Sequence, residues 1–373
     1  MKKVIIFYIS KLSGHFHAAN AIEKGLLSIS DDIQVEKINA LEYTNPILGR
    51  IINRAYLEVI KIKPEFWGNI YDNPEVMKRT EKARKTLHKF NEEKMKKLLE
   101  KFSPDTIFCT QAFPCGMVAD YKRISGKTLS LVGVLTDYAP HSYWLFDEVN
   151  FYVTPSEETK QVLINKGVKE SKVKVYGIPV DPKFEVKKDK ASLKKEMGLT
   201  EDHPVIFIMG GNQGLGEIEE SVKLMLSEDK HFYQLIVVTG SNKKLYSKLR
   251  KIEKRKPGGT IKVLPFADNV DEIMEVSDVI VTKAGGLTVA EALEKNLPMI
   301  IVSPIPGHER MNTDYLVSKG AAIEIKEQKD LYKDLDRLFD DREFLKIMKK
   351  KTEQLAKTSS ALNIARLAFE KTD

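Results

Sequence analysis

The sequence is poor in cysteine, with only Cys109 and Cys115 among its 373 residues. This single close pair gives neither a disulfide framework nor a recognised metal-binding spacing. We therefore expect a reducing compartment, in which both thiols act as small buried hydrophobic side chains.

Long hydrophobic runs are missing as well. The apolar stretch at the N-terminus ends at Ser10 and Ser13, too early to span a membrane, and it lacks a signal-peptide cleavage pattern. We therefore expect the protein to stay in the cytosol. Internal repeats and low-complexity tracts are absent too. The balance of 42% hydrophobic and 30% charged residues is typical of a globular chain, here long enough for two domains.

The net charge of +7 is concentrated in residues 43–101, which contain fourteen Lys and Arg against eight Asp and Glu. Apolar and aromatic residues such as Tyr56, Phe66 and Trp67 are interleaved with the bases. This mixture is typical of a surface that lies on anionic lipid. A helical hairpin with a solvated basic face explains the charge equally well. Nucleic acid is not expected as a partner, because no recognised binding motif accompanies the charge.

Apolar, β-branched runs alternate with helical patterns along the chain. Residues 3–10 predict a strand and residues 17–27 a helix, which together form a βα unit. Further strands are predicted at 105–109, 128–134 and 149–154, and then at 204–209, 233–240, 260–264, 278–282, 298–302 and 321–325. The helix-incompatible segment 177–182 and the lysine-rich stretch after it predict a hinge between the two series. The pattern predicts an α/β protein with two Rossmann-like, doubly wound domains facing a cleft, in which ligands lie at the carboxyl ends of the strands.

The first strand is followed by Ser13-Gly14-His15. A histidine at such a turn lies at a helix N-terminus, where the helix dipole favours the neutral imidazole that a general base requires. A lone histidine near a turn is more often structural, so this reading stays a hypothesis. His17 is the more passive of the two histidines.

Two further glycine turns follow strands of the second series. In the turn at 209–214, Gly211 and Asn212 could bring backbone amides close to a phosphate, although the run fits neither the dinucleotide nor the Walker pattern. A tight turn without a ligand explains it equally well. In the turn at 282–291, Thr288 and Glu291 have capping-box spacing, or they contact a phosphate and a ribose.

The polar residues in 307–312 follow a rigid, proline-containing turn and are suitable hydrogen-bonding partners for sugar hydroxyls. An Asp-x-Asp sequence at Asp334 and Asp336 falls in an amphipathic helical pattern, and we interpret both carboxylates as solvated rather than metal-binding.

Six motifs occur in order: SGHFHAANAI, LTDYAPHSYW, YGIPVDPKFE, IMGGNQG, TKAGGLTVAEAL and PIPGHERMN. Together they resemble the family of monogalactosyldiacylglycerol synthases and bacterial processive diacylglycerol glucosyltransferases. They are more distantly similar to the N-acetylglucosaminyltransferase that makes the lipid-linked peptidoglycan precursor. The resemblance implies a GT-B fold in which the C-terminal helix returns to the N-terminal domain. It assigns residues 1–179 to acceptor and membrane binding, 180–355 to UDP-sugar binding and 356–373 to the returning helix.

The resemblance also implies roles for individual residues. His15 matches the catalytic base, with Asp137 orienting the acceptor. The acceptor side would include Gly14, His141 and Trp144, and the donor side Gly211, Asn212, Phe266, Gly285, Gly286, Thr288, Glu291, His308, Glu309 and Asn312. Within the donor side, Gly211 and Asn212 match the diphosphate loop, Phe266 the uracil site, Thr288 the α-phosphate contact and Glu291 the ribose contact.

The implied reaction is the inverting transfer of glucose or galactose from a UDP-sugar to the 3-hydroxyl of diacylglycerol. It would need no metal and no cofactor, since the UDP-sugar is a substrate. The protein would act as a peripheral enzyme on the inner face of the cell membrane, with the segment 43–101 on anionic lipid. Gly307-His308-Glu309 stands where the family commonly has Pro-Gly-Gln-Glu, so the donor sugar stays open. The number of sugars added and the oligomeric state stay open too.

Three rival functions remain. The first is a UDP-N-acetylglucosamine transferase acting on a polyprenyl acceptor. The second is a UDP-sugar epimerase, which would need no acceptor. The third is a membrane-associated regulator that binds a UDP-sugar without turning it over.

Overall fold

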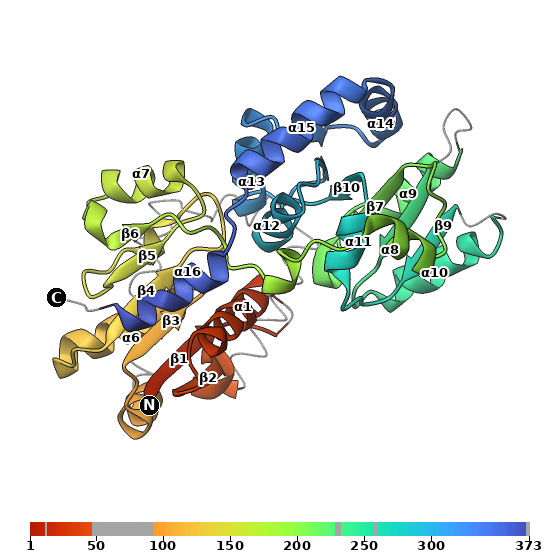
Figure 1. Cartoon of the computed structure of the whole chain (residues 1–373). Helices are drawn as coiled ribbons and strands as arrows, with labels where there is room; N and C mark the ends of the chain where they lie inside the picture. Colours follow the sequence, from red (N-terminus) through yellow and green to blue (C-terminus); the bar gives the residue numbers. More distant parts are fainter. Residues whose placement is uncertain (12, 47–92, 228–232, 257–259, 371–373) are drawn as a thin grey trace. The chain divides into compact units, whose positions relative to one another are not determined.

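The computed structural model describes residues 1–11, 13–46, 93–227, 233–256 and 260–370 (Figure 1). The chain forms two compact units. Unit 1 comprises Met1–Pro182, Ile305–His308 and Lys357–Asp373, and unit 2 comprises Lys183–Pro304 and Glu309–Ala356. No helix in the described parts of the chain has the length and apolarity needed to cross a bilayer.

Unit 1 is built on a parallel six-stranded sheet in the order β2-β1-β3-β4-β5-β6. Its strands are β1 (Lys2–Tyr8), β2 (Ile33–Asn39), β3 (Thr106–Cys109), β4 (Ser130–Val134), β5 (Phe151–Val153) and β6 (Val173–Lys174). Alternate residues of β1 enter different cores: Val4 and Ile6 pack in one, Ile5 and Phe7 in the other. Side chains that point to opposite faces of a strand require cover on both faces, which explains the fully apolar run in β1.

Helices supply that cover. They include α1 (Gly14–Ile29), α2 (Ala40–Thr44), α6 (Ala112–Ser125), α7 (Glu157–Asn165) and α16 (Ser360–Arg366), with short 3₁₀ turns at Ser142–Trp144, Glu170–Lys172 and Leu367–Phe369. Helix α16 lies beside α1 although the two come from opposite ends of the sequence (Figure 1). They pack so closely that a Cβ at Gly25 would lie 2.6 Å from the Ala361 carbonyl oxygen, so only glycine fits there.

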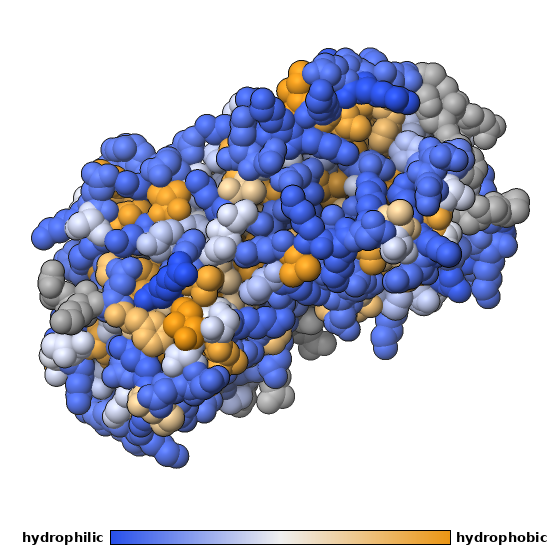
Figure 2. All heavy atoms as spheres, viewed as in Figure 1, coloured by the Kyte–Doolittle hydropathy of each residue, from blue (hydrophilic) through white to orange (hydrophobic). Residues whose placement is uncertain are grey.

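Unit 2 has a second parallel sheet, in the order β12-β11-β10-β7-β8-β9. Its strands are β7 (Val205–Met209), β8 (Gln234–Val238), β9 (Ile261–Leu264), β10 (Val279–Thr282), β11 (Met299–Val302) and β12 (Ala322–Ile325). Its helices are α8 (Lys190–Glu196), α9 (Ile218–Ser227), α10 (Lys243–Glu253), α11 (Val270–Val276), α12 (Gly286–Glu294), α13 (His308–Ser318), α14 (Leu331–Asp340) and α15 (Arg342–Leu355), with 3₁₀ turns at Pro182–Phe184, Gly211–Gln213 and Gln328–Asp330. Hydrophilic residues cover most of the face of the molecule seen in Figure 2.

The structure confirms the predicted strands, the parallel sheets and the α/β class. It adds β2 and β6, which the sequence pattern does not reveal. It confirms that Cys109 and Cys115 are buried free thiols, and burial raises the pKa of Cys109 well above its ordinary value. The reading of the Asp-x-Asp pair as solvated is wrong for Asp336. This carboxylate is buried and accepts a 2.9 Å hydrogen bond from the Tyr233 hydroxyl, because α14 turns it toward the core.

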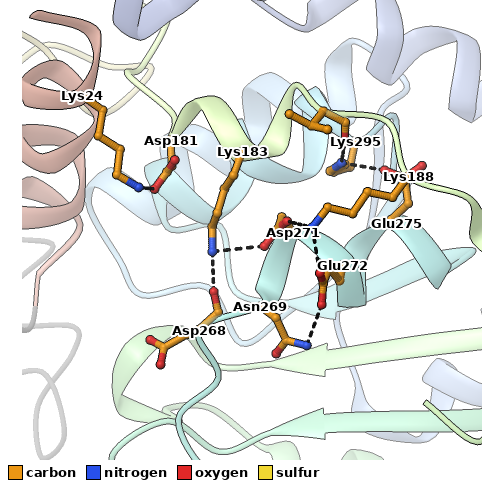
Figure 3. Close-up of polar contacts among 11 residues, drawn as sticks. Lys24, Asp181, Lys183, Lys188, Asp268, Asn269, Asp271, Glu272, Glu275 and Lys295 are labelled. Atoms are coloured by element: carbon orange, nitrogen blue, oxygen red, sulfur yellow. Dashed lines mark hydrogen bonds and ion pairs between the residues drawn. The ribbon is translucent and has the colours of Figure 1, made fainter. Parts of the chain in front are cut away.

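The lysine-rich stretch predicted to be a hinge is held to the body of unit 2 (Figure 3). Lys183 and Lys188 each form a 3.0 Å ion pair with Asp271 on α11. Burial raises the pKa of Asp271, but the two ammonium groups outweigh that effect and the pKa is lowered overall. Lys295 is also buried, and it bonds the Val186 carbonyl and Glu275. These ion pairs fix the path of the chain from Lys183 onward.

Glu294, the last residue of α12, gives a pH-dependent prediction. Burial, and then the nearby Glu185, raise its pKa from 4.5 to about 7. The folded state therefore binds more protons than the unfolded state between these pH values, and stability falls as the pH rises through this window. We expect Glu294→Gln to raise the free energy of unfolding at pH 8 by about 1–2 kcal/mol, allowing for solvent screening, and to change it little at pH 5.

Thermal melting of Glu294→Gln at both pH values measures this effect. The control is Glu196→Gln, which removes an exposed carboxylate from the end of α8. An equal gain in both variants at pH 8 would mean that the helix terminus, and not burial, is responsible.

Candidate functional site

In unit 1 the chain leaves β1 through a tight turn that starts α1. Ser10 adopts a left-handed conformation with φ of 60°, which is uncommon outside glycine. The Ser13 hydroxyl donates to the Ser10 carbonyl over 2.7 Å and contacts the Ile9 carbonyl at 2.5 Å. It is therefore engaged in the turn and does not cap α1. The turn places Gly14 and His15 as the first two residues of the helix.

His15 is held at two points by residues that follow neighbouring strands. Its Nδ1 lies 3.2 Å from the Thr136 hydroxyl, just beyond β4, and its carbonyl accepts a 3.0 Å hydrogen bond from the Thr110 hydroxyl, just beyond β3. Burial lowers the pKa of His15, opposed by the charge of Asp137, and the pKa lies below 6.5 overall. The imidazole is therefore mostly neutral at pH 7.

The remaining acceptor-side residues lie after β4. Asp137 follows Thr136 directly, and its charge acts on His15. The rings of His141 and Trp144 stack with centroids 6.3 Å apart. Trp144 is buried in the core of unit 1. The buried Trp144 ring therefore restricts the position of the His141 ring.

In unit 2 the turn after β7 is packed against backbone. A Cβ at Gly210 would lie 1.9 Å from the Leu215 carbonyl oxygen, and one at Gly214 would lie 2.1 Å from that of Thr239. These two glycines are required by the turn itself. Gly211, with φ of 66°, has no such backbone neighbour, while the Asn212 carbonyl accepts a 2.9 Å bond from the Ser241 amide.

The turn after β10 differs from the prediction in one respect. Helix α12 begins at Gly286, with Gly285 as its N-cap and no side-chain capping bond. Thr288 is the third helical residue, so the capping-box interpretation of Thr288 and Glu291 is wrong. The N-terminus of α12 thus presents backbone amides without a capping side chain, an arrangement that suits an anion.

A residue that the sequence analysis passed over joins these turns. Lys283, directly after β10, forms an ion pair with Glu309 on α13. The Glu309 side chain is 1% exposed and that of Lys283 is 17% exposed. A Cβ at Gly211 would lie 3.5 Å from Cε of Lys283, and one at Gly285 would lie 3.9 Å from Oε1 of Glu309. The ammonium group therefore lies beside both glycine turns.

Two further contacts fix this edge of the sheet. The Thr282 hydroxyl donates to the Met209 carbonyl over 2.6 Å and joins the ends of β10 and β7. The buried Asn312 amide donates to the Ala284 carbonyl over 2.9 Å and ties α13 to the turn. The sequence did contain a signal for Lys283: a lysine placed between an apolar strand and a glycine turn is positioned to contact a bound anion.

The other predicted donor residues lie on separate elements. His308 opens α13, and Glu291 lies on α12, half-buried. Phe266 is 51% exposed and lines a cavity of about 520 Å³ in the loop after β9, with Lys183 and Lys188 on its border. Within the described residues no cluster of three or more His, Cys, Asp and Glu side chains is placed to hold a metal ion.

Two family models match the chain. Residues 15–180 match the model described as monogalactosyldiacylglycerol (MGDG) synthase, and residues 205–365 match the model described as the glycosyltransferase family 28 C-terminal domain. The first begins at His15, and the second contains both glycine turns beside Lys283.

Among curated proteins, the processive diacylglycerol beta-glucosyltransferase of Bacillus pumilus (strain SAFR-032) is 29% identical over 373 residues, which is 100% of this chain and 96% of the relative. The protein of the same name from Bacillus subtilis (strain 168) is 27% identical over 361 residues, covering 96% of this chain and 93% of the relative.

Among solved structures, MurG of Acinetobacter baumannii superposes with a TM-score of 0.67 at 17% identity, and the match covers 100% of both chains. At this identity the likeness establishes the fold. The two units therefore form the two-domain fold found in that protein.

Proposed function

Because the chain belongs to the family of monogalactosyldiacylglycerol synthases and processive diacylglycerol glucosyltransferases, we propose that it transfers a hexose from a UDP-sugar to the 3-hydroxyl of diacylglycerol. The observation that carries the proposal is the chemistry at the strand ends of each unit. Unit 1 presents a neutral histidine, and unit 2 presents a half-buried lysine, paired with a buried glutamate, beside two glycine turns. An acceptor hydroxyl needs the first, and a diphosphate leaving group needs the second.

The imidazole of His15 takes the proton of the acceptor hydroxyl. The resulting oxygen forms a bond to the anomeric carbon while the bond from that carbon to the UDP oxygen breaks on the opposite face. The product is a β-glycoside with inverted configuration. The proton passes from His15 to solvent, and Asp137 stabilises the transient imidazolium through its charge.

The leaving UDP carries negative charge that unit 2 stabilises. The N-terminus of α12 and the Gly211–Asn212 turn supply backbone amides, and Lys283 supplies a fixed cation. The electrostatic role often filled by a metal is thus assigned to protein groups. Around the diphosphate, Phe266 holds the uracil, Thr288 the α-phosphate, Glu291 the ribose, and His308, Glu309 and Asn312 the sugar.

We propose glucose as the donor sugar. The support is the name of the Bacillus relatives, which are beta-glucosyltransferases. Galactose stays the alternative, because this chain has His308 where the family commonly has glutamine.

The protein is proposed to work as a peripheral enzyme on the cytoplasmic face of the cell membrane. Diacylglycerol is a membrane lipid, and the basic, aromatic segment 43–101 has the composition of a surface that contacts anionic headgroups. Most of that segment, residues 47–92, lies outside the described residues.

One assay tests the activity. Purified protein is incubated with diacylglycerol in anionic vesicles and with radiolabelled UDP-glucose or UDP-galactose, in EDTA, and the lipids are separated by chromatography. We expect a labelled glycolipid from UDP-glucose, and parallel vesicles without anionic lipid should give less product. UDP-N-acetylglucosamine with a polyprenyl acceptor, and UDP-sugar alone, are run beside it. The proposal would be replaced by one of the three rival functions if product formed only from the polyprenyl acceptor, if the UDP-sugar were epimerised without an acceptor, or if it bound without turnover.

A further inference from the structure

We infer that Thr136 is a positioning residue that holds the proton of neutral His15 on Nδ1 and leaves the Nε2 lone pair for the acceptor hydroxyl. The inference rests on the proposed function, because it assigns His15 as a base. It concerns an atom-level property of the ring, which can be observed without any turnover.

The geometry makes Thr136 a fixed partner. The preceding residue, Leu135, donates its amide to the Val153 carbonyl over 3.0 Å and so anchors the chain to β5. Thr136 is 8% exposed, and its branched Cβ restricts χ1, so its hydroxyl has a defined position. That hydroxyl lies 3.2 Å from Nδ1 of His15.

The opposite side of His15 is fixed as well. Thr110 donates its amide to the Phe7 carbonyl over 3.0 Å, and its hydroxyl donates to the His15 carbonyl over 3.0 Å. The backbone of His15 is thus tied to β1 and β3 while its ring is tied to the end of β4. The imidazole is held at Nδ1, and Nε2 is the nitrogen left to serve as the base.

The direction of the hydrogen bond follows from what a base must do. Neutral imidazole has one N–H and one lone pair, whereas imidazolium has two N–H groups. If the hydroxyl accepts from Nδ1–H, the same bond persists before and after Nε2 takes a proton. If the hydroxyl donated to Nδ1, Nε2 would carry the proton and the ring could not act as a base at that atom. Only the accepting arrangement needs no reorientation during the reaction.

A hydroxyl partner also suits the pKa of His15. A carboxylate bonded to Nδ1 would favour the imidazolium and raise the pKa. The neutral hydroxyl holds the proton on Nδ1 without adding charge, and the pKa of His15 stays below 6.5. Thr136 therefore orients the ring, while Asp137 acts through its charge.

The decisive experiment determines the tautomer of His15 by NMR. The protein is labelled with ¹⁵N at histidine, and ¹⁵N chemical shifts and long-range ¹H–¹⁵N correlations show which ring nitrogen carries the proton. The variant His15→Gln identifies the signals of His15. At pH 8 we expect the proton on Nδ1 in the unmodified chain and in Thr136→Ser. In Thr136→Val we expect the proton to move toward Nε2. The matched control is Thr110→Val, which loses a hydroxyl bonded to His15 but not to its ring, and its tautomer should match that of the unmodified chain.

Kinetics supply the second measurement. We expect Thr136→Val to lower kcat roughly tenfold, the size expected for one hydrogen bond, with little change in KM for the UDP-sugar, and Thr136→Ser to restore most of it. A proton on Nε2 in the unmodified chain would overturn the inference, even if Thr136→Val fails to fold. Full kcat in a folded Thr136→Val would overturn it too. The tautomer can be measured even if the chain transfers no sugar. Failure of the proposed function can therefore be distinguished from failure of this inference.

Discussion

Replacement of His15 by alanine is expected to lower turnover by about 10²–10⁴, the effect typical of a lost general base. The affinity for UDP should stay unchanged, because the glycine turns and Lys283 belong to unit 2. The measurement is initial-rate sugar transfer to diacylglycerol, beside calorimetric titration with UDP. The matched control is His17→Ala, which removes the neighbouring histidine of the same helix and should retain most of the turnover. Near-normal turnover in His15→Ala, or equal losses in both variants, would reject the assignment of the base.

The pH profile of the unmodified enzyme sharpens this expectation. Burial holds the pKa of His15 below the ordinary 6.5. A base is active when unprotonated, so kcat/KM should rise with pH along an acid limb whose midpoint lies below 6.5, and then level off. Removing the charge of Asp137 with Asp137→Asn should move that midpoint to lower pH, since the carboxylate favours the imidazolium. A midpoint that moves upward would contradict the charge effect.

Sequence patterns predicted the central strands of unit 2, β7, β8, β10 and β11, because every residue of these strands is buried. Residues such as Ile206, Phe207 and Ile208 form an uninterrupted apolar run, which a central parallel strand requires. The same reasoning failed for β2. Gln34, Glu36 and Lys37 interrupt its apolar pattern, because β2 is an edge strand that is covered less completely.

The capping box predicted at Thr288 and Glu291 was wrong for a local reason. A threonine followed three residues later by glutamate indicates a capping box. Here the helix has already begun at Gly286, and Gly285 takes the N-cap position. Glycine tolerates the N-cap without a side-chain bond, so spacing alone could not place the start of the helix.

The two side-chain contacts on which the proposed chemistry depends could not be predicted from the sequence. His15 meets Thr136 across 121 positions, and Lys283 meets Glu309 across 26 positions. Each pair forms only because parallel strands bring their carboxyl ends to the same edge of a sheet. The sequence predicted that edge, but the pairing of side chains there depends on packing that a linear pattern does not encode.

The second large effect is expected at Lys283. Changing it alone would remove the ammonium partner of the buried Glu309 carboxylate and destabilise unit 2, so the informative variant is the double substitution Lys283→Met with Glu309→Gln. If Lys283 faces the diphosphate, this variant should bind UDP about 10–100-fold more weakly, the effect of a lost charge-assisted hydrogen bond. Uridine carries no phosphate, so its affinity should not change. Turnover should fall by at least the same factor, because negative charge grows on UDP as it leaves and because Glu309→Gln also changes a residue proposed to hold the sugar.

Titration calorimetry with UDP, UMP and uridine separates these contributions. The chain offers a matched control at the opposite end of α12, where the buried Lys295 side chain forms a part-buried ion pair with Glu275. Lys295→Met with Glu275→Gln removes an equivalent pair that lies away from the glycine turns. It should lower thermal stability as much as the Lys283 variant and leave UDP affinity unchanged. Equal losses for UDP and uridine in the Lys283 variant, or equal losses of UDP affinity in both double variants, would show that the lysine maintains the fold of unit 2 and does not bind the phosphates.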